Sequence, residues 1–321
     1  MKKILVIGSS NTDLITNVER FPNAGETISG KSFMQAMGGK GANQAVAAKR
    51  LGGDVMFVTC LGNDANGRNT LSYFQGEGLD VSNALVVDYA PTGTAVILVN
   101  DEGENCIVVT PGANHELLPL HIEGLESEIS KAAMIVLQME IPFETVEKVA
   151  DIAAKHKIPV LLNVAPAREI GIELLRKIEI LVVNETEIEL VSGQSIEELG
   201  EEGVIDKLIS IGARTVILTL GKRGCIVKNA ALTKHVPAFD VNAVDTTAAG
   251  DTFCGALVAG LSKGRDLVEA ARFATAASAI CVTRMGAQPS IPTEDEVAKL
   301  LSKGIVLSTN GVSRSNKKPI V

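Results

Sequence analysis

The chain has 321 residues, of which 46% are hydrophobic, and a formal net charge of −8 at pH 7. This length allows one large domain or two small ones, and an acidic balance without a basic cluster on one face argues against a nucleic-acid surface. The apolar runs are too short to cross a membrane or to form a signal peptide. The five scattered cysteines, without a Cys-x-x-Cys pair, predict reduced thiols in a cytoplasmic protein.

Short runs of β-branched and apolar residues alternate along the chain with helical patterns. We expect strands at 3–8, 55–61, 134–138, 159–163, 180–183 and 215–220. We expect helices near 41–51, 67–77, 143–156, 185–192 and 251–263. Near-continuous apolar strands separated by helices are typical of a mostly parallel sheet covered on both faces, so the sequence predicts a single α/β domain at 1–307. Residues 308–321 are polar and aperiodic, and we expect a disordered tail there.

Two regions, 12–37 and 90–109, break this alternation because they have the pattern of extended strands and hairpins. In the second region, the apolar runs 94–99 and 106–109 flank a turn at 100–103 that ends in glycine. Such strands have no place between the helices of the main sheet, so we predict a small separate β-sheet. The alternative is an ordinary surface hairpin.

Small residues crowd the segment before the helix at 251–263, which reads Val244-Asp245-Thr246-Thr247-Ala248-Ala249-Gly250-Asp251-Thr252-Phe253. Without bulky side chains, the amides of Ala248, Ala249 and Gly250 can approach a phosphate, and the start of the helix adds the positive end of its dipole. Asp251 would then lie beside the phosphoryl group, where its carboxylate can take a proton from an attacking hydroxyl. The alternative is that Asp251 is only an acid favoured at a helix N-terminus.

This segment resembles the C-terminal signature of the ribokinase family of sugar and nucleoside kinases. A second block, Gly38-Gly39-Lys40-Gly41-Ala42-Asn43-Gln44-Ala45, is similar to the N-terminal signature of that family. It is not a P-loop, because Gly41 and Ala42 follow Lys40 where a Ser or Thr is needed for magnesium. Glycines such as Gly39 that admit a ligand to the backbone, followed by Lys40 and Asn43 one helical turn apart, suit a sugar with several hydroxyl groups.

The resemblance implies a ribokinase-like three-layer sandwich in which the small sheet is a lid over the sugar. Its exposed strand edges need a partner, so we expect a homodimer through the lid. The resemblance also implies sugar contacts by Asn11, Asp13 and Glu140, which follow predicted strands. Active sites of open α/β sheets lie at the carboxyl ends of strands, where these residues fall. The alternatives are loop-forming roles for Asn11 and Asp13 and a solvated strand end for Glu140.

Asn184-Glu185-Thr186-Glu187 follows the strand at 180–183 and resembles the Asn-x-x-Glu motif of the family. The resemblance implies that Asn184 lies near the phosphates of ATP and that Glu187 orders the waters of a Mg²⁺ ion. On the pattern alone a capped helix is favoured, with Asn184 as N-cap and Glu187 at N3, and the two roles are compatible. The resemblance further assigns ATP contacts to Thr219, Gly221, Gly224 and Gly250. Taken alone, the Gly-x-x-Gly pattern in this set predicts only a turn.

The segment from Cys281 to Ser290 also resembles the family, and without that resemblance it would predict only a loop. The resemblance implies that it joins the Asp-Thr-Thr segment to hold a monovalent cation. The implied ligands are Asp245, Thr247, Cys281, Gly286 and Ser290. Cys281 and Gly286 would act through their carbonyl oxygens. Potassium is expected, because a large, weakly hydrated cation suits a cage of carbonyl groups and one carboxylate.

The resemblance therefore implies ATP-dependent phosphorylation of D-ribose at the 5-hydroxyl, and Thr247-Ala248 favours ribose over deoxyribose. A kinase for another sugar, such as deoxyribose or fructose, or for a nucleoside is the alternative within the class. Two Tyr, eight Phe and no Trp disfavour a nucleoside, because few rings can stack on a base. Alternatives from other classes are a non-catalytic sugar-binding regulator and a dinucleotide-dependent oxidoreductase. Asp251 together with Asn184 and Glu187 argues against the first, and the missing Gly-x-Gly-x-x-Gly argues against the second.

Overall fold

The computed structural model describes residues 2–303, so the tail expected at 308–321 lies outside the described residues. Its main element is an eight-stranded sheet with the order β14-β13-β12-β11-β10-β9-β1-β4. Neighbours from β4 to β12 are parallel, whereas β13 is antiparallel to both β12 and β14. The strands are β1 (Ile4–Ile7), β4 (Val55–Val58), β9 (Met134–Leu137), β10 (Val160–Asn163), β11 (Ile180–Asn184), β12 (Thr215–Thr219), β13 (Cys225–Asn229) and β14 (Leu232–Val236). In the described part of the chain, no helix has both the length and the hydropathy to span a membrane.

All six strands predicted for the main sheet are present, but the one expected at 55–61 was predicted too long. The structure divides it at Thr59 into β4 and a separate strand, β5 (Cys60–Gly62). β5 leaves the main sheet and pairs in parallel with β6 (Leu85–Val87). The division is possible because β4 is an edge strand, so the chain can leave the sheet without interrupting a ladder on a second side.

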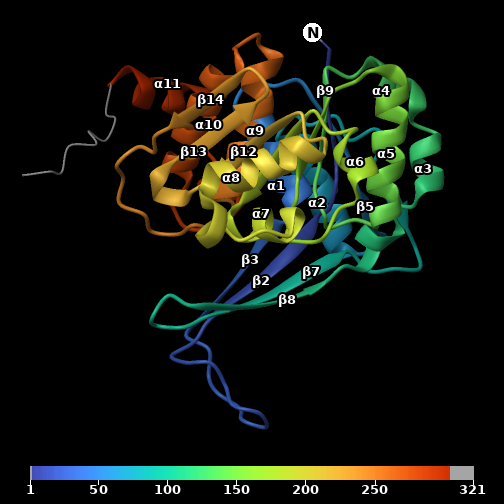
Figure 1. Cartoon of the computed structure of the whole chain (residues 1–321). Coiled ribbons are helices and arrows are strands. Elements are labelled where there is room, and N and C mark those ends of the chain that lie inside the picture. Colours follow the sequence, from blue (N-terminus) through green and yellow to red (C-terminus); the bar gives the residue numbers. More distant parts are fainter. Residues whose placement is uncertain (1, 304–321) are drawn as a thin grey trace, which may run out of the picture.

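Helices cover both faces of the sheet because the side chains of a strand alternate between its faces. Along β1, Ile4 and Val6 belong to one buried core, whereas Leu5 and Ile7 belong to a second core on the opposite face. The first core is covered by α1 (Lys40–Arg50), α2 (Ala65–Gly76), α9 (Ala249–Ser262), α10 (Leu267–Cys281) and α11 (Glu294–Ser302). The second is covered by α3 (Pro119–Glu123), α4 (Glu126–Lys131), α5 (Phe143–His156), α6 (Ile172–Leu175), α7 (Glu185–Ser192) and α8 (Ile196–Ile211). The predicted three-layer α/β sandwich is confirmed (Figure 1).

Several elements were not indicated by the sequence patterns. Helix α10 is rich in buried alanines and so lacks a clear polar face, and α8 contains Gly200 with a non-helical backbone, which interrupts its periodicity. The hairpin of β13 and β14 turns at Ala230-Ala231, without the Asn-Gly or Asp-Gly signal of tight turns. Within residues 2–303 there are also three short 3₁₀ helices: η1 (Gly112–Glu116), η2 (Gly221–Arg223) and η3 (Gln288–Ser290).

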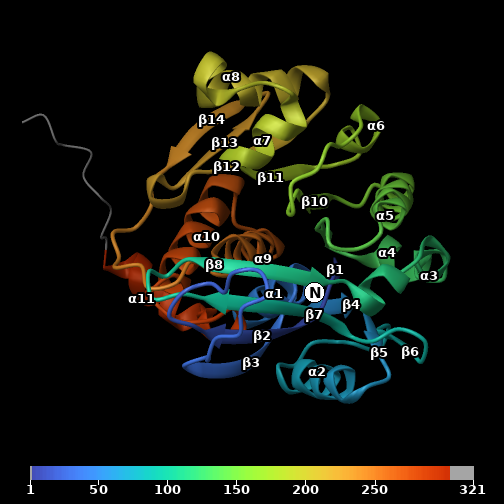
Figure 2. The same cartoon turned by 90° about the horizontal axis from the view of Figure 1, so that it is seen from below.

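A second, four-stranded sheet confirms the predicted small β-sheet, and we call it the lid. Its order is β3-β2-β7-β8, with strands β2 (Asn11–Asn17), β3 (Ser32–Gly38), β7 (Gly93–Val99) and β8 (Asn105–Thr110). The chain enters the lid directly after β1 and returns from β3 into α1, so the lid is attached at the carboxyl end of β1. Figure 1 shows the lid below the body of the molecule, with the loop at 18–31 reaching farthest from it. Figure 2 shows the four lid strands running side by side across the view from below.

Candidate active site

Asp251 lies buried in the first turn of α9. The helix begins at Ala249, directly after Ala248, whose backbone is left-handed with φ 58°. This conformation costs a residue with a Cβ about 1–2 kcal/mol, and such strain is concentrated at functional sites. A Cβ added to Gly250 would meet no atom within 4 Å, so the helix start is open on that side. The amide of Ala249 already donates to the carbonyl oxygen of Thr246 at 3.2 Å, which weakens its availability to an anion.

Two side-chain amides of α1 hold the carboxylate of Asp251. Asn43 Nδ2 donates to Oδ2 at 2.9 Å, and Gln44 Nε2 donates to Oδ1 at 3.0 Å. The N-terminal and C-terminal signatures, which are far apart in the sequence, therefore meet at one carboxylate. An acid that only favours a helix N-terminus needs no partner on another helix. Both carboxylate oxygens of Asp251 accept hydrogen bonds from side chains of α1.

Five of the residues predicted to bind sugar gather between the lid and the carboxyl ends of β1 and β9. They are Asn11, Asp13, Lys40, Asn43 and Glu140, and we call them the polar cluster. Glu140 accepts from the hydroxyl of Ser9 at 2.6 Å and from the backbone amide of Lys40 at 2.9 Å, so it is held in place rather than freely solvated. Asn11 and Asp13 are buried on β2, in a strand rather than in a loop.

The glycines of the N-terminal signature serve close packing within the protein. A Cβ at Gly38 would lie 2.1 Å from Asp13 Oδ2, and one at Gly41 would lie 2.5 Å from the backbone nitrogen of Ser9. Gly39 has φ +89°, a conformation that residues with a Cβ rarely adopt. These glycines make room for the carboxylate of Asp13 and for the backbone after β1, and their role in admitting a ligand stays a prediction. The sugar contact of Gly39 stays a prediction.

Burial and neighbouring carboxylates control the charges in this region. Burial, reinforced by the carboxylates of Glu140 and Asp251, raises the pKa of Asp13 to about 7. Burial by itself would lower the pKa of Lys40, but the carboxylates of Asp251, Glu140 and Glu187 outweigh it and raise that pKa above its usual value. Lys40 is thus a firmly charged ammonium surrounded by acids, and it offsets their mutual repulsion.

A cavity of about 620 Å³ opens beside the start of α9, within the size range of small-molecule sites. Of the residues predicted to contact nucleotide, Thr219, Gly221, Gly224 and Gly250 line it. The cavity is also bounded by the segment 238–243 and by Ser278 of α10, which no sequence motif indicated. Because Gly250 precedes Asp251 in the chain, this cavity and the polar cluster meet at the same helix start.

The structure confirms the capping interpretation of Asn184 and Glu187. Asn184 Oδ1 accepts from the amide of Glu187 at 2.8 Å, and Glu187 Oε2 accepts from the amide of Asn184 at 2.9 Å. Asn184 does not line the 620 Å³ cavity. Glu187 is buried, and burial raises its pKa although the bond from Asn184 and the charge of Lys40 act in the opposite direction. The magnesium role of Glu187 stays a prediction.

The loops predicted to hold a monovalent cation lie against each other. Asp245 accepts from the backbone amides of Thr247 at 2.9 Å and Gly286 at 2.8 Å. Burial opposes ionisation of Asp245, but these hydrogen bonds outweigh it and lower the pKa. The thiol of Cys281 lies 3.0 Å from Ser290 Oγ and 3.7 Å from the carbonyl oxygen of Thr247. These contacts bring the five predicted ligand residues together. One carboxylate with carbonyl and hydroxyl groups is a donor set that fits K⁺.

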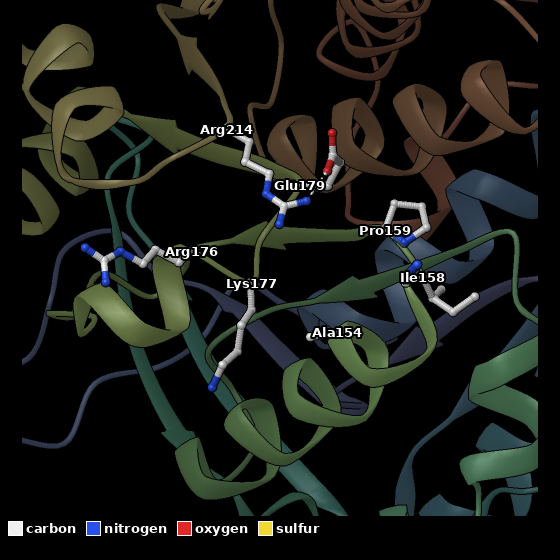
Figure 3. Close-up of a pocket in the computed structure, with 8 residues that line it drawn as sticks. Ala154, Ile158, Pro159, Arg176, Lys177, Glu179 and Arg214 are labelled. Atoms are coloured by element: carbon white, nitrogen blue, oxygen red, sulfur yellow. Dashed lines mark hydrogen bonds and ion pairs between the residues drawn. The ribbon is translucent and has the colours of Figure 1, made fainter.

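A smaller hollow of about 240 Å³ lies at the amino ends of the strands, on the opposite side of the main sheet from the polar cluster (Figure 3). It is at the amino ends of β10, β11 and β12, because Pro159, Glu179 and Arg214 immediately precede these strands. Three of its cationic side chains form ion pairs: Arg214 with Glu179, Lys177 with Asp151, and Arg176 with Glu173. In Figure 3, Arg176 and Lys177 point away from Arg214 rather than converging on one point. We therefore assign no ligand to this hollow.

Five buried side-chain amides around the site were not indicated by the sequence motifs. Gln44 bonds to Asp251, Gln138 and Asn163 bond to Gln44, and Gln288 and Asn114 bond to Asn43 and Asn11 of the polar cluster. A usable signal did exist, because Gln44 and Gln138 interrupt apolar or alanine-rich runs, and a buried polar group in such a run needs a specific partner.

The chain matches the family model described as pfkB family carbohydrate kinase over residues 1–294. It is 41% identical over 304 residues to the ribokinase of Haemophilus influenzae, covering 94% of this chain and 98% of that protein. It is 36% identical over 301 residues to the deoxyribokinase of Salmonella typhimurium, covering 93% of this chain and 98% of that protein. Among solved structures, Arabidopsis thaliana ribokinase complexed with ribose and ATP has a TM-score of 0.87 at 34% identity, covering 94% of this chain and 98% of that one. The signatures, the site and these matches agree, and the chain belongs to the pfkB family of carbohydrate kinases.

Proposed function

We propose that this carbohydrate kinase transfers the γ-phosphoryl group of ATP to the 5-hydroxyl of D-ribose. The observation that carries the proposal is the position of Asp251. Its carboxylate accepts a hydrogen bond from Asn43 of the polar cluster, and its neighbour Gly250 lines the 620 Å³ cavity. One buried carboxylate therefore lies where a sugar bound in the cluster and a nucleotide bound in the cavity would meet.

In the proposed reaction, Asp251 accepts the proton of the 5-hydroxyl as that oxygen bonds to the γ-phosphorus. The bond from the γ-phosphorus to the bridging oxygen breaks, and ADP leaves. The amides of Ala248, Ala249 and Gly250 stabilise charge on the transferring group. For this, the Ala249 amide exchanges its 3.2 Å bond to Thr246 for a phosphoryl oxygen. Positioning and preorganised dipoles supply most of the acceleration.

The polar cluster supports a polyhydroxylated acceptor, because its carboxylates, amides and ammonium offer both acceptors and donors to hydroxyl groups. Within it, Asn11, Asp13 and Glu140 would accept from or donate to the sugar, with Gly39, Lys40 and Asn43 at the start of α1. Ribose is proposed over 2-deoxyribose on two grounds: Thr247-Ala248, and the higher identity to a ribokinase, 41%, than to a deoxyribokinase, 36%.

The lining of the cavity by Thr219, Gly221 and Gly224 supports ATP as the phosphoryl donor, as does the Arabidopsis relative described with ribose and ATP. We propose that Glu187 orders the waters of a Mg²⁺ ion, since its buried carboxylate lies close enough to Lys40 and Asp251 to affect their charge balance. When bound, Mg²⁺ neutralises phosphate charge. Asn184 caps the helix and so fixes Glu187 at the helix start. We also propose that Asn184 lies near the phosphates of ATP.

A K⁺ ion is part of the proposal and would be held by Asp245, Thr247, Cys281, Gly286 and Ser290. The ionised Asp245 supplies the charge, and its bond to Gly286 already joins the two loops. Bound K⁺ would supply positive charge and order to the segment that leads into Ala248. The protein residues still carry out the reaction.

We also propose a homodimer through the lid. Strand register and alternation put Asp13 on one lid face, and the same face continues outward as Ile15, Met34, Ile97 and Ile107. Met34 and Ile107 are exposed, and a second copy with the same stripe would cover them by two-fold symmetry. The cytoplasmic location proposed with this assembly is supported by the five free cysteines.

The proposal is tested by ADP release from ATP with D-ribose, 2-deoxy-D-ribose, D-fructose and adenosine as acceptors, with the product identified by phosphorus NMR. We expect the highest kcat/KM with D-ribose and phosphorylation at the 5-position. A higher kcat/KM with another acceptor would replace ribose as the substrate. Sugar binding without ADP release from any acceptor would indicate a non-catalytic regulator.

A further inference from the structure

Gln44 is fully enclosed, and its side-chain amide uses all of its main hydrogen-bonding capacity. Its Nε2 donates to Asp251 Oδ1 at 3.0 Å and to Asn163 Oδ1 at 3.1 Å. Its Oε1 accepts from Gln138 Nε2 at 2.7 Å. The two N–H groups and the carbonyl of this one amide therefore all point at named partners.

These partners determine which way the amide of Gln44 faces. Rotating it by half a turn would set its oxygen against the carboxylate of Asp251 and the oxygen of Asn163. The same rotation would set its nitrogen against the nitrogen of Gln138. Asn163 is itself oriented, because its Nδ2 donates to the carbonyl oxygen of Val182 at 3.3 Å. The network thus has one consistent arrangement, in which Gln44 always presents an N–H to Asp251.

Close packing of α1 on α9 keeps Gln44 and Asp251 at hydrogen-bond distance. Gly255 lies one helical turn after Asp251, on the same face of α9. A Cβ at Gly255 would lie 2.5 Å from Ala47 Cβ and 2.7 Å from the carbonyl oxygen of Gln44. Only a glycine allows this approach, and the approach brings the side chain of Gln44 to the carboxylate.

The two amides on Asp251 differ in what else they can reach. Asn43 belongs to the polar cluster, where the sugar would bind, so a sugar can compete for its side-chain amide. Asn43 is also held by Gln288, whose Nε2 donates to its Oδ1 at 3.1 Å. Gln44 has no exposed surface and cannot touch a substrate, so its bond to Asp251 persists when the site is occupied.

We infer that Gln44 is a positioning residue for phosphoryl transfer, which holds Oδ1 of Asp251 so that the carboxylate faces the acceptor hydroxyl. This inference rests on the proposed function, in which Asp251 is the base. Gln138 and Asn163 act one step farther away, by fixing the orientation of the Gln44 amide.

The test compares Gln44→Met with Gln138→Met, since both remove a buried amide from the same network but only the first removes a bond to Asp251. We expect Gln44→Met to lower kcat roughly 10- to 100-fold, the effect of losing one hydrogen bond to a charged group, with little change in the KM for sugar. Gln138→Met leaves the bond to Asp251 in place, so its kcat falls less at a similar loss of thermal stability. Equal kcat losses in the two variants, in proportion to stability, would reduce Gln44 to a packing role.

The pH profile gives a readout that packing alone would not change. A carboxylate that loses an N–H donor binds a proton more readily, so the acidic limb of kcat moves to higher pH in Gln44→Met. Should that variant not fold, Gln44→Glu keeps an acceptor for Gln138 and places a second carboxyl against Asp251, which moves the same limb in the same direction. An unshifted limb in the folded variant would overturn the inference.

Failure of the proposed function has a different signature. If the parent enzyme prefers another acceptor, the kcat comparison is made with that acceptor, and only the ribose assignment falls. If it phosphorylates no acceptor, crystal structures of the parent and of Gln44→Met test whether Gln44 orients the carboxylate of Asp251. We expect the carboxylate of Asp251 to rotate when Gln44 is replaced. The same carboxylate orientation in both structures would show that Gln44 does not position it.

Discussion

Asn43 Nδ2 donates to Asp251 Oδ2 across 2.9 Å, so the start of α1 and the start of α9 share a hydrogen bond although 208 residues separate them in sequence. Each helix begins after a different strand-to-helix connection, α1 after β3 and α9 after the loop that follows β14. The bond places the proposed base at the boundary between the polar cluster and the nucleotide cavity. Changes at either helix start should therefore affect the transfer step.

We predict that Asp251→Asn lowers kcat by about 10²–10⁴-fold, the usual contribution of a general base. Asn keeps the size of Asp but cannot accept the proton, and its amide nitrogen must face one of the two N–H donors from α1. Sugar affinity, measured by calorimetry, should stay within several-fold of the parent. Asp206→Asn, at an exposed ion pair on α8, is the matched control and should keep full activity. Turnover of Asp251→Asn within about tenfold of the parent would remove Asp251 from the base role.

Glu187→Gln separates the capping role of this residue from its proposed magnesium role. Gln at N3 can still accept from the amide of Asn184, so the helix cap and the free energy of unfolding should change little. The lost charge should raise the Mg²⁺ concentration needed for half-maximal rate by about tenfold or more. Asn184→Ala is the complementary variant, and it should cost about 1 kcal/mol of stability through loss of the cap. An unchanged Mg²⁺ dependence in Glu187→Gln would leave Glu187 with the cap alone.

Six of the eight strands of the main sheet were predictable because each is a short apolar run between helical patterns. The hairpin of β13 and β14 was not, because its turn lacks glycine and its strands add to the sheet in the antiparallel direction. Strand 55–61 was predicted too long because apolar composition continues through Thr59, while the division depends on which strand is at the edge of the sheet.

The candidate site was predictable where a motif concentrates chemically distinctive residues, as around Asp251 and Lys40. Gln44 and Gln138 give a weaker signal, because a polar residue in an apolar or alanine-rich run indicates a buried amide but not the groups that the amide contacts. The purpose of Gly38 was also hidden, since it depends on Asp13 lying across the neighbouring strand. Tertiary contacts, rather than local patterns, give these three residues their roles.

Asp13 should make stability depend on pH. Its pKa is raised from 3.8 to about 7, so between these values the folded protein binds a proton more tightly than the unfolded chain. The contribution of Asp13 to the free energy of unfolding is therefore full below about pH 4 and is lost as pH rises through 7. In Asp13→Asn this term is absent. We expect the free energy of unfolding of the parent, minus that of the variant, to fall by on the order of a few kcal/mol from pH 4 to pH 8. Urea unfolding measures both free energies. Parallel curves for the two proteins would show that Asp13 is ionised throughout.

The lid stripe predicts that two neighbouring residues of β8 respond differently to a charge. Ile107 lies on the face that bears Asp13, whereas Val108 lies on the opposite face, and both are exposed. Ile107→Lys should dissociate the proposed dimer at micromolar concentration, because a buried lysine without a partner is costly. Val108→Lys should leave it intact. Sedimentation velocity measures both, and a monomeric parent would refute the dimer.

Potassium should activate the enzyme through the loops that Asp245 connects. Asp245 accepts from Gly286, and Thr247 directly precedes Ala248, so a cation bound there would order the segment that leads into the proposed anion hole. Sodium is smaller and would fill the same cage of oxygens poorly, which makes the effect specific to the ion rather than to ionic strength. At fixed Mg²⁺ and ionic strength, initial rates should fall several-fold when K⁺ is exchanged for Na⁺ or for a bulky organic cation. Asp245→Asn should remove most of this difference, because it removes the charge of the cage. Equal rates of the parent in all three salts would show that the loops at 245–247 and 281–290 are held by protein contacts alone.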